Sequence, residues 1–239
     1  MSPIAQSVTA VLQAGGRGER LRPITDHTSK CLLPVGGSPI IERLIGQINE
    51  TGIRSVTVIT GWLGEQVGAH VQSIAGSFPK LELSVMRETQ RLGNIGGLSQ
   101  LPPTENNLLF LFADLVTDMD FASLLAAHLA SDADITLASH LDPYQLSFGE
   151  LEVDGTRVTK YIEKPIKHTL ICSGVAALRQ SAVGLIPAGR PMGIADLVTV
   201  ALREGMRVAH RQHEALWIDV NSEAALLAAD RAVSGTDIA

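Results

Sequence analysis

Residues 12–35 read LQAGGRGERLRPITDHTSKCLLPV, and this stretch carries more information about the chain than any other. It continues an apolar run that begins at residue 8 and predicts a buried strand. Glycines lack the side chains that would keep a ligand away from the backbone N–H groups. Exposed N–H groups beside clustered cations are typical of a polyphosphate site, and a solvated basic turn is the simpler alternative. The glycines are Gly15, Gly16 and Gly18, and the cations are Arg17, Arg20, Arg22 and Lys30.

The spacing of these glycines excludes two commoner phosphate loops. The Walker A loop needs Gly, four residues and then Gly-Lys-Ser/Thr, a string that the chain lacks. The dinucleotide fingerprint needs a third glycine where the chain has Leu21, and Pro23 soon interrupts any helix. The stretch instead resembles the signature of the sugar-1-phosphate nucleotidylyltransferases, roughly L-A-A-G-x-G-T-R-L-x-P-L-T and, further on, K-P-L-x-P-V. Gln13 and Glu19 depart from this signature.

The composition predicts one large α/β domain or two small ones. The chain has 239 residues, of which 45% are hydrophobic and 18% charged, so it can bury a sizeable core. A net charge of −6 argues against a nucleic-acid groove and an anionic membrane surface, so we expect neither partner. No apolar stretch is long enough to span a membrane, and no basic leader precedes the first strand. Cys31 and Cys172 lie far apart and are expected to be free thiols in the cytoplasm.

Strand and helix patterns alternate along the first half of the chain, which predicts a mostly parallel sheet. Ser38-Pro39 predicts the start of a helix that Gly52 closes, and Asn221 is expected to cap the last helix. The second half contains a hairpin with an Asp154-Gly155 turn. We expect strands at 8–12, 55–60, 81–86, 108–113, 135–138, 149–153, 158–163, 171–178, 208–210 and 216–220, and helices at 39–51, 65–75, 121–130, 194–203 and 222–233.

No linker or internal repeat divides the chain, so we expect a single domain over residues 1–239. Residues up to about 120 would form its nucleotide-binding half, and residues 121–239 a half that covers the mouth of the site. The family resemblance implies the three-layer Rossmann-like α/β fold of nucleotidyltransferases, with a mixed, mostly parallel central sheet.

Two aspartates lie at or just after the ends of strands that are expected to meet at the same edge of the sheet. Asp114 comes directly after the apolar run 108–113, and Asp219 lies in the short strand 216–220. Ligands of open α/β sheets bind beyond the carboxyl ends of the strands, and paired carboxylates suit Mg²⁺. A turn residue and a neighbour of a helix cap are the alternative interpretations. The resemblance implies that Asp114 and Asp219 are the family's metal aspartates, and hence that Mg²⁺ is the cofactor.

The tripeptide Glu163-Lys164-Pro165 follows the predicted hairpin. A carboxylate accepts hydrogen bonds from sugar hydroxyls, and a lysine can hold a phosphate. Alone, the tripeptide is an exposed charged turn. In sequence order with Gly149 and Ser173-Gly174, it resembles the family's sugar site. The resemblance implies that Gly149, Glu163, Lys164 and Ser173 bind the sugar phosphate.

Residues 87–98 resemble the family's base-reading segment, in which Leu92-Gly93 match and Asn94-Ile95 depart. Glu88 lies where the family places a side chain that reads the base. A carboxylate only accepts hydrogen bonds, and guanine offers two adjacent donors, so we expect GTP to be preferred, CTP second, and UTP and dTTP lower. Gln13 and backbone groups of Ala14 and Gly93 are alternative base readers. The implied nucleotide-binding residues are Leu12, Gln13, Ala14, Gly15, Gly16, Arg17, Gly18, Glu88, Leu92 and Gly93.

The reaction implied is that of an NTP with a sugar 1-phosphate, giving an NDP-sugar and pyrophosphate. In this reading Arg20 and the loop hold the β- and γ-phosphates, and Lys30 stabilises the charge that develops at the α-phosphate. A cytidylyltransferase acting on a phospho-alcohol or phosphonate and a non-catalytic nucleotide-sugar-binding regulatory protein remain alternatives. The identity of the sugar and the state of oligomerisation, including a homo-oligomer, are left open.

Overall fold

The computed structural model describes residues 7–102 and 104–235. Within these residues, a seven-stranded sheet runs in the order β12 (Val208–Gln212), β8 (Ile135–Gln145), β11 (Ile166–Leu178), β6 (Asn107–Phe112), β1 (Val8–Ala14), β4 (Ser55–Thr60) and β5 (Glu82–Arg87). Neighbouring strands are parallel, except that β11 is antiparallel to both β6 and β8. The predicted mixed, mostly parallel sheet is therefore confirmed.

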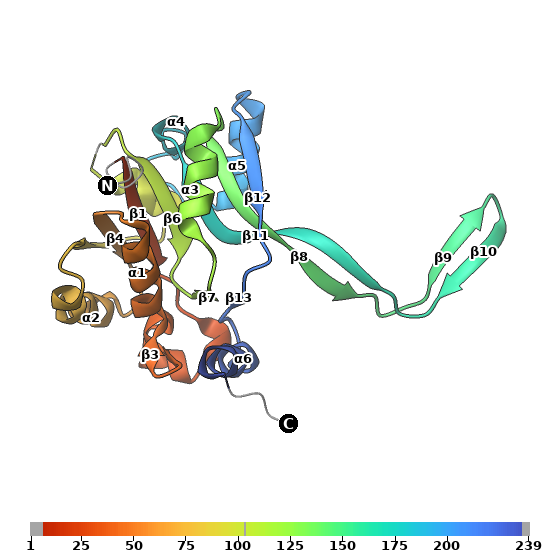
Figure 1. Cartoon of the computed structure of the whole chain (residues 1–239), viewed down its shortest axis with the longest axis horizontal. Coiled ribbons are helices and arrows are strands. Elements are labelled where there is room, and N and C mark those ends of the chain that lie inside the picture. Colours follow the sequence, from red (N-terminus) through yellow and green to blue (C-terminus); the bar gives the residue numbers. More distant parts are fainter. Residues whose placement is uncertain (1–6, 103, 236–239) are drawn as a thin grey trace.

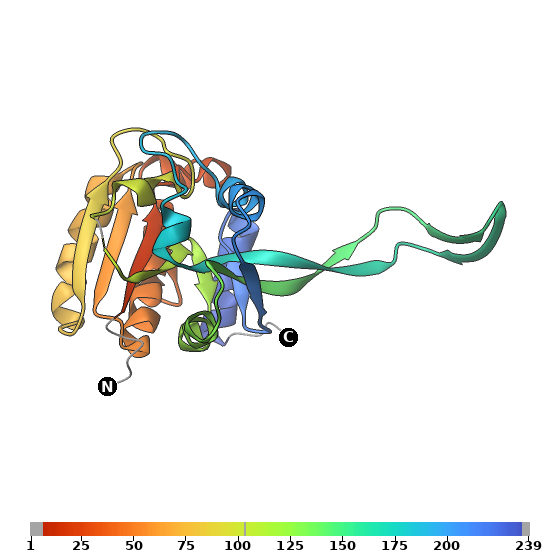
Figure 2. The same cartoon turned by 90° about the horizontal axis from the view of Figure 1, so that it is seen from above.

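Helices cover both faces of the sheet and make three layers (Figure 2). The first face packs against α1 (Ile40–Thr51), α2 (Gly64–Ile74) and α3 (Phe121–Ala130), and the second against α4 (Gln180–Val183) and α5 (Ile194–Arg203). Strand β6 shows why both faces are apolar. Leu109 and Leu111 belong to the first core, whereas Leu108 and Phe110 belong to the second, as the period-two alternation of a strand requires.

Two pairs of short strands and a final helix complete the body. They are β2 (Pro34–Val35) with β3 (Ser38–Pro39), β7 (Leu115–Thr117) with β13 (Trp217–Asp219), and the last helix α6 (Glu223–Ser234). Ser38 and Pro39 pair with β2, so α1 begins one residue later than predicted. Gly52 ends α1 in the left-handed region, as expected. Ser222, not Asn221, caps α6, because its side chain accepts a hydrogen bond from Ala225 N–H.

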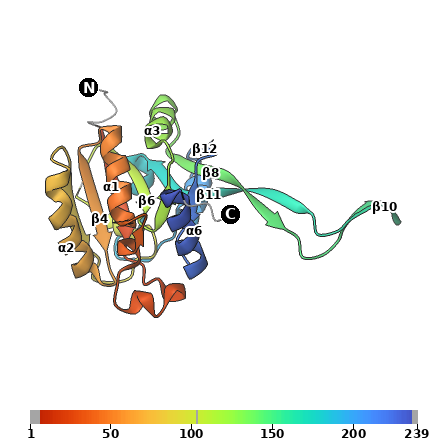
Figure 3. The same cartoon turned by 60° about the horizontal axis from the view of Figure 1, so that its bottom comes forward.

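The largest departure from the sequence-based prediction is an arm that projects from the body (Figures 1 and 3). Strand β8 continues seven residues beyond the predicted 135–138, and strand β11 begins five residues before the predicted 171–178. They continue into the hairpin of β9 (Glu150–Asp154) and β10 (Arg157–Ile162), whose Asp154-Gly155 turn was predicted. We call residues 141–171 the arm. No helix in the described residues is long and apolar enough to cross a membrane.

Candidate active site

A cleft of about 490 Å³ lies beyond the carboxyl ends of β1 and β6. It collects many of the residues singled out from the sequence. Its lining comprises Gln13, Gly15, Gly16, Arg17, Gly18, Glu19, Arg20, Lys30, Glu88, Arg91, Gly93, Asn94, Phe112, Asp114 and Asn221. The parallel pairing of β1 with β6 places Gln13 beside Phe112, which brings the glycine loop next to Asp114. Segments that are distant in the sequence thus meet at the carboxyl ends of the parallel strands and form one site.

The glycine loop is held by contacts that a larger residue would prevent. Gly18 has φ +61°, and a β-carbon there would lie 2.8 Å from a methyl carbon of Thr25. The Thr25 hydroxyl donates to the Gly18 carbonyl at 2.8 Å. Trp62, at the end of β4, donates from its ring to the Thr25 carbonyl and from its backbone to Gly15. The guanidinium of Arg17 lies 4.9 Å from the centre of the Trp62 ring. The loop is therefore shaped before any ligand arrives.

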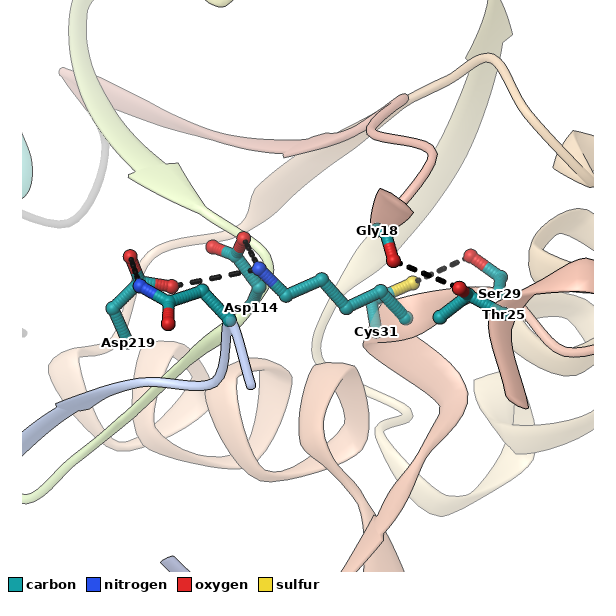
Figure 4. A network of polar contacts seen from close by, with 8 residues as sticks. Gly18, Thr25, Ser29, Cys31, Asp114 and Asp219 are labelled. Carbon is teal, nitrogen blue, oxygen red and sulfur yellow. Dashed lines mark hydrogen bonds and ion pairs between the residues drawn. The ribbon is translucent and has the colours of Figure 1, made fainter. Parts of the chain in front are cut away.

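Lys30 lies between two aspartates at the floor of the cleft. Its Nζ is 2.5 Å from Asp114 Oδ2 and 3.5 Å from Asp219 Oδ1. Figure 4 shows dashed lines that join the carboxyl groups of Asp114 and Asp219 to the same ammonium group, that of Lys30. The register of β7 with β13 pairs Asp219 with Leu115, and Val220 N–H donates to the Asp114 carbonyl at 3.0 Å. Two carboxylates more than a hundred residues apart thereby share one cation.

A second hollow of about 390 Å³ adjoins the cleft and shares three residues with it, Asn94, Phe112 and Asp114. Its other lining residues are Leu115, Cys172, Gly174, Ile194, Trp217 and Asp219. We call this second hollow the acceptor pocket; Asp114 lines both it and the cleft, and Asp219 lines the acceptor pocket. A molecule in the cleft and a molecule in the acceptor pocket would meet at these aspartates and Lys30.

Glu88 and Gln13 form a polar pair on the other side of the cleft. Gln13 Nε2 donates to Glu88 Oε2 at 3.5 Å. Burial raises the pKa of the Glu88 carboxyl, and the Gln13 hydrogen bond partly opposes this rise. Glu88 Oε1 and Gln13 Oε1 are both buried and have no partner within the described residues. Buried acceptors without donors are costly, so this pair is suited to receive donors from a ligand.

Three predicted nucleotide-binding residues do not line the cleft. Leu12, Ala14 and Leu92 are buried in the core. Leu92 anchors the neighbouring loop through its carbonyl, which accepts from Met192 N–H at 2.9 Å. Gly93 does line the cleft, with φ +80° and no room for a β-carbon beside the Met192 carbonyl.

The predicted sugar-phosphate residues are divided by the fold. Ser173 is fully buried beside the acceptor pocket, between two residues that line it. Gly149, Glu163 and Lys164 lie on the arm and line neither the cleft nor the acceptor pocket. On the arm, Glu163 accepts a hydrogen bond from the Tyr161 hydroxyl at 2.9 Å.

A histidine cluster that the sequence analysis missed supports the wall of the acceptor pocket. Ser173 Oγ lies 2.9 Å from His140 Nδ1 and 2.8 Å from His213 Nε2. Trp217, which lines the pocket, stacks on His140 with ring centres 4.4 Å apart and donates to the Ser173 carbonyl at 2.7 Å. Burial lowers the pKa of both histidines. Their spacing carries no motif, because these distant residues meet only through the antiparallel pairing of β8 with β11 and the parallel pairing of β8 with β12.

Comparison with known proteins identifies the family. The family model described as Nucleotidyl transferase matches residues 9–235. The chain is 28% identical to N-acetylmuramate alpha-1-phosphate uridylyltransferase of Neisseria meningitidis, covering 89% of this chain and 93% of that protein. It is 30% identical to mannose-1-phosphate guanylyltransferase of Mycobacterium tuberculosis, covering 82% of this chain but only 55% of that protein.

The fold is shared with solved structures. UDP-glucose pyrophosphorylase from Acinetobacter baumannii superposes with a TM-score of 0.71 at 17% identity, covering 93% of this chain and 91% of that one. The glycine loop and the paired aspartates agree with the family match over residues 9–235. The chain therefore belongs to the nucleotidyl transferase family, among the sugar-1-phosphate nucleotidylyltransferases.

Proposed function

We propose that this chain transfers a nucleotidyl group from an NTP to a sugar 1-phosphate, releasing pyrophosphate. A phosphate oxygen of the sugar 1-phosphate attacks the α-phosphorus in line. The bond from the α-phosphorus to the bridging oxygen breaks, and pyrophosphate leaves with that oxygen. The observation that carries this proposal is Lys30 lying between Asp114 and Asp219, where the glycine-loop cleft meets the acceptor pocket.

The loop residues are proposed to neutralise and orient the triphosphate. Arg20 and the N–H groups around Gly15, Gly16 and Gly18 would hold the β- and γ-phosphates, since all of them line the cleft. Lys30 would stabilise the negative charge that grows at the α-phosphate. Its side chain is only 12% exposed, so water screens this charge weakly. Catalysis then rests on positioning and charge, without a protein nucleophile.

Asp114 and Asp219 are proposed to hold Mg²⁺ together with substrate phosphates. No cluster of three or more His, Cys, Asp or Glu side chains suitable for a metal occurs in the described part of the chain. This donor set still fits Mg²⁺, which is commonly bound by one or two carboxylates with phosphates and water. Asn221 Nδ2 donates to Asp219 Oδ2 at 2.9 Å and orients that carboxylate. The ion would supply charge neutralisation at the transferring phosphate, and Lys30 would then contact phosphate.

Glu88 is proposed to read the base, with GTP preferred, CTP second, and UTP and dTTP lower. Its two neighbours Gly15 and Gly97 leave room for the carboxylate, since a β-carbon on either would lie within 3.1 Å of it. The ring N–H and exocyclic amine of guanine match the buried acceptors of Glu88 and Gln13.

The setting proposed for the enzyme is the cytoplasm, where the two free cysteines would stay reduced. The chain is proposed to act as one domain, with residues up to about 120 supplying the triphosphate side of the cleft and later residues the acceptor side.

The test is pyrophosphate release with five NTPs against sugar 1-phosphates, phospho-alcohols and phosphonates. Release that needs both an NTP and a sugar 1-phosphate supports the proposal. Release only with CTP and a phospho-alcohol or phosphonate would replace it with a cytidylyltransferase. Binding of an NDP-sugar without any turnover would indicate a regulatory protein.

A further inference from the structure

The loop that carries Gly93 is joined to the segment that leads into α5. Met192 N–H donates to the Leu92 carbonyl at 2.9 Å, and Ile95 N–H donates to the Met192 carbonyl at 3.2 Å. Gly93 lines the cleft, whereas Ile194, the first residue of α5, lines the acceptor pocket. A segment from the nucleotide side of the site and a segment from the acceptor side are thus tied together by backbone hydrogen bonds.

Asn94 adds a side-chain contact between these two segments, and the contact fixes the orientation of its amide. The first N–H groups of a helix have no partner within the helix, and the residue before α5 is Gly193, which has no side chain to accept from them. Asn94 Oδ1 accepts from Ile194 N–H at 2.9 Å instead. Only the oxygen of an amide can accept from an N–H group, so Asn94 Nδ2 is the atom left to donate. Within residues 7–102 and 104–235, Nδ2 has no hydrogen-bond partner.

Asn94 also lies where the two hollows meet. Among the described residues, only Asn94, Phe112 and Asp114 line both the cleft and the acceptor pocket. A phosphate that passes from a molecule in the cleft to a molecule in the acceptor pocket has to lie at this junction. Phe112 is apolar, and a carboxylate such as that of Asp114 only accepts hydrogen bonds. Of the three shared residues, Asn94 is therefore the one that can donate a hydrogen bond to a phosphate oxygen.

The acceptor pocket offers few other donors to an anion. None of the described residues that line it is a lysine or an arginine. The ring N–H of Trp217 already donates to the Ser173 carbonyl at 2.7 Å, and the thiol of Cys172 is a weak donor. Among the described side chains of this pocket, the amide of Asn94 is thus the remaining strong donor.

We propose that Asn94 is a catalytic residue, whose Nδ2 group donates a hydrogen bond to a non-bridging oxygen of the α-phosphate during nucleotidyl transfer. The assignment rests on the proposed function. A donor that is oriented before the substrates arrive need not reorganise as charge develops, and the contact with Ile194 supplies that orientation. Asn94 is one of the residues at which this chain departs from the family's base-reading segment, so the donor belongs to this chain rather than to the family signature.

Two substitutions of Asn94 separate the donor from the helix cap. Asn94→Ala loses both contacts, and we expect it to lower kcat by about 10²-fold and the melting temperature by about 2–4 °C. Asn94→Asp keeps an oxygen for Ile194 N–H but replaces the donor with a carboxylate oxygen that repels phosphate. It should lower kcat at least as far, with the melting temperature unchanged or raised. The assay is pyrophosphate release at saturating NTP and sugar 1-phosphate.

The matched control is Asp196→Ala, at the same end of α5. Asp196 Oδ2 accepts from Gly193 N–H at 2.9 Å, and Asp196 lines neither the cleft nor the acceptor pocket. This variant should lower the melting temperature by about 2–4 °C, as Asn94→Ala does, but should change kcat by less than about twofold. An equal loss of kcat in Asp196→Ala would overturn the proposal, because the loss would then come from the helix end and not from the amide donor.

NTPs that carry sulfur in place of one non-bridging α-oxygen locate the contact. Sulfur accepts hydrogen bonds weakly, so the donor contributes little with the diastereomer whose sulfur faces Asn94. With that diastereomer, Asn94→Ala should lower kcat by less than about threefold, whereas with the other it should lower kcat by about 10²-fold. Equal losses with both diastereomers, or a raised KM for the sugar 1-phosphate without a loss of kcat, would overturn the placement of Asn94 at the α-phosphate.

The same assays distinguish this proposal from the function on which it rests. A wild type that makes no NDP-sugar from any NTP and sugar 1-phosphate would refute the proposed function, and the role of Asn94 with it. An active wild type together with an equally active Asn94→Asp variant would overturn the role of Asn94 alone.

Discussion

Replacing Lys30 with methionine isolates the charge at the centre of the site. Methionine keeps most of the apolar stem of a side chain that is only 12% exposed, so the fold should be retained. The Lys30 ammonium lies 2.5 Å from Asp114 and 3.5 Å from Asp219, where few waters can replace it. Loss of one donor aimed at transition-state charge costs about 10²- to 10³-fold in kcat, or roughly 2.7 to 4 kcal/mol. We expect a loss in this range, with KM for the NTP changed by less than about tenfold.

The matched control is Arg17→Ala. Arg17 lies on the same loop but stacks on Trp62 rather than approaching the aspartates, so its loss should lower kcat less than about fivefold. The assay is continuous pyrophosphate release at saturating NTP and sugar 1-phosphate. Calorimetry without nucleotide should also show tighter Mg²⁺ binding in Lys30→Met, because the two carboxylates lose their shared cation. Equal small losses in both variants would refute the catalytic role and leave the loop as a mere attractor of phosphate.

Asp114→Asn and Asp219→Asn should each lower kcat by about 10²-fold or more and raise the Mg²⁺ concentration needed, and near wild-type rates at limiting Mg²⁺ would contradict this. Burial raises the pKa of Glu88, so its carboxylate is protonated at a higher pH than that of an exposed glutamate. We therefore expect kcat/KM for GTP to fall on acidification at a higher pH than an exposed glutamate would require, and Glu88→Gln to flatten this profile. Gly93→Ala, at φ +80° against Met192, should lower the unfolding free energy by about 1–3 kcal/mol, and an unchanged melting temperature would argue against the strain.

The site residues that lie at the ends of strands could be predicted from the sequence. A continuous apolar run before Asp114 predicts a central strand, and the carboxyl ends of parallel strands meet at one edge, which is why Asp114 could be expected near the glycine loop. Asp219 was harder, since it depends on the antiparallel pairing of two three-residue strands. Its convergence with Asp114 could be expected mainly from the family resemblance.

Contacts that depend on distant pairing could not be predicted. The hydrogen bonds of Trp62 to the backbone carbonyls of Gly15 and Thr25 are an example, because they require the loop geometry itself. The contact of His140 with His213 through Ser173 requires the register of β8 with both β11 and β12. The arm was read as an ordinary hairpin, because alternating apolar and polar residues predict a two-faced strand pair but not whether the apolar face is covered.

Transfer of a nucleotidyl group between two bound substrates can be followed with a labelled nucleotide. The most direct measurement uses NTP labelled at the α-phosphorus together with a sugar 1-phosphate, in wild type and in Asp114→Asn. We expect wild type to move the label into an NDP-sugar, with one pyrophosphate released per product, and Asp114→Asn to form about a hundredfold less NDP-sugar in the same time. Label appearing in the nucleoside monophosphate, or equal labelling of the product by the variant, would contradict it.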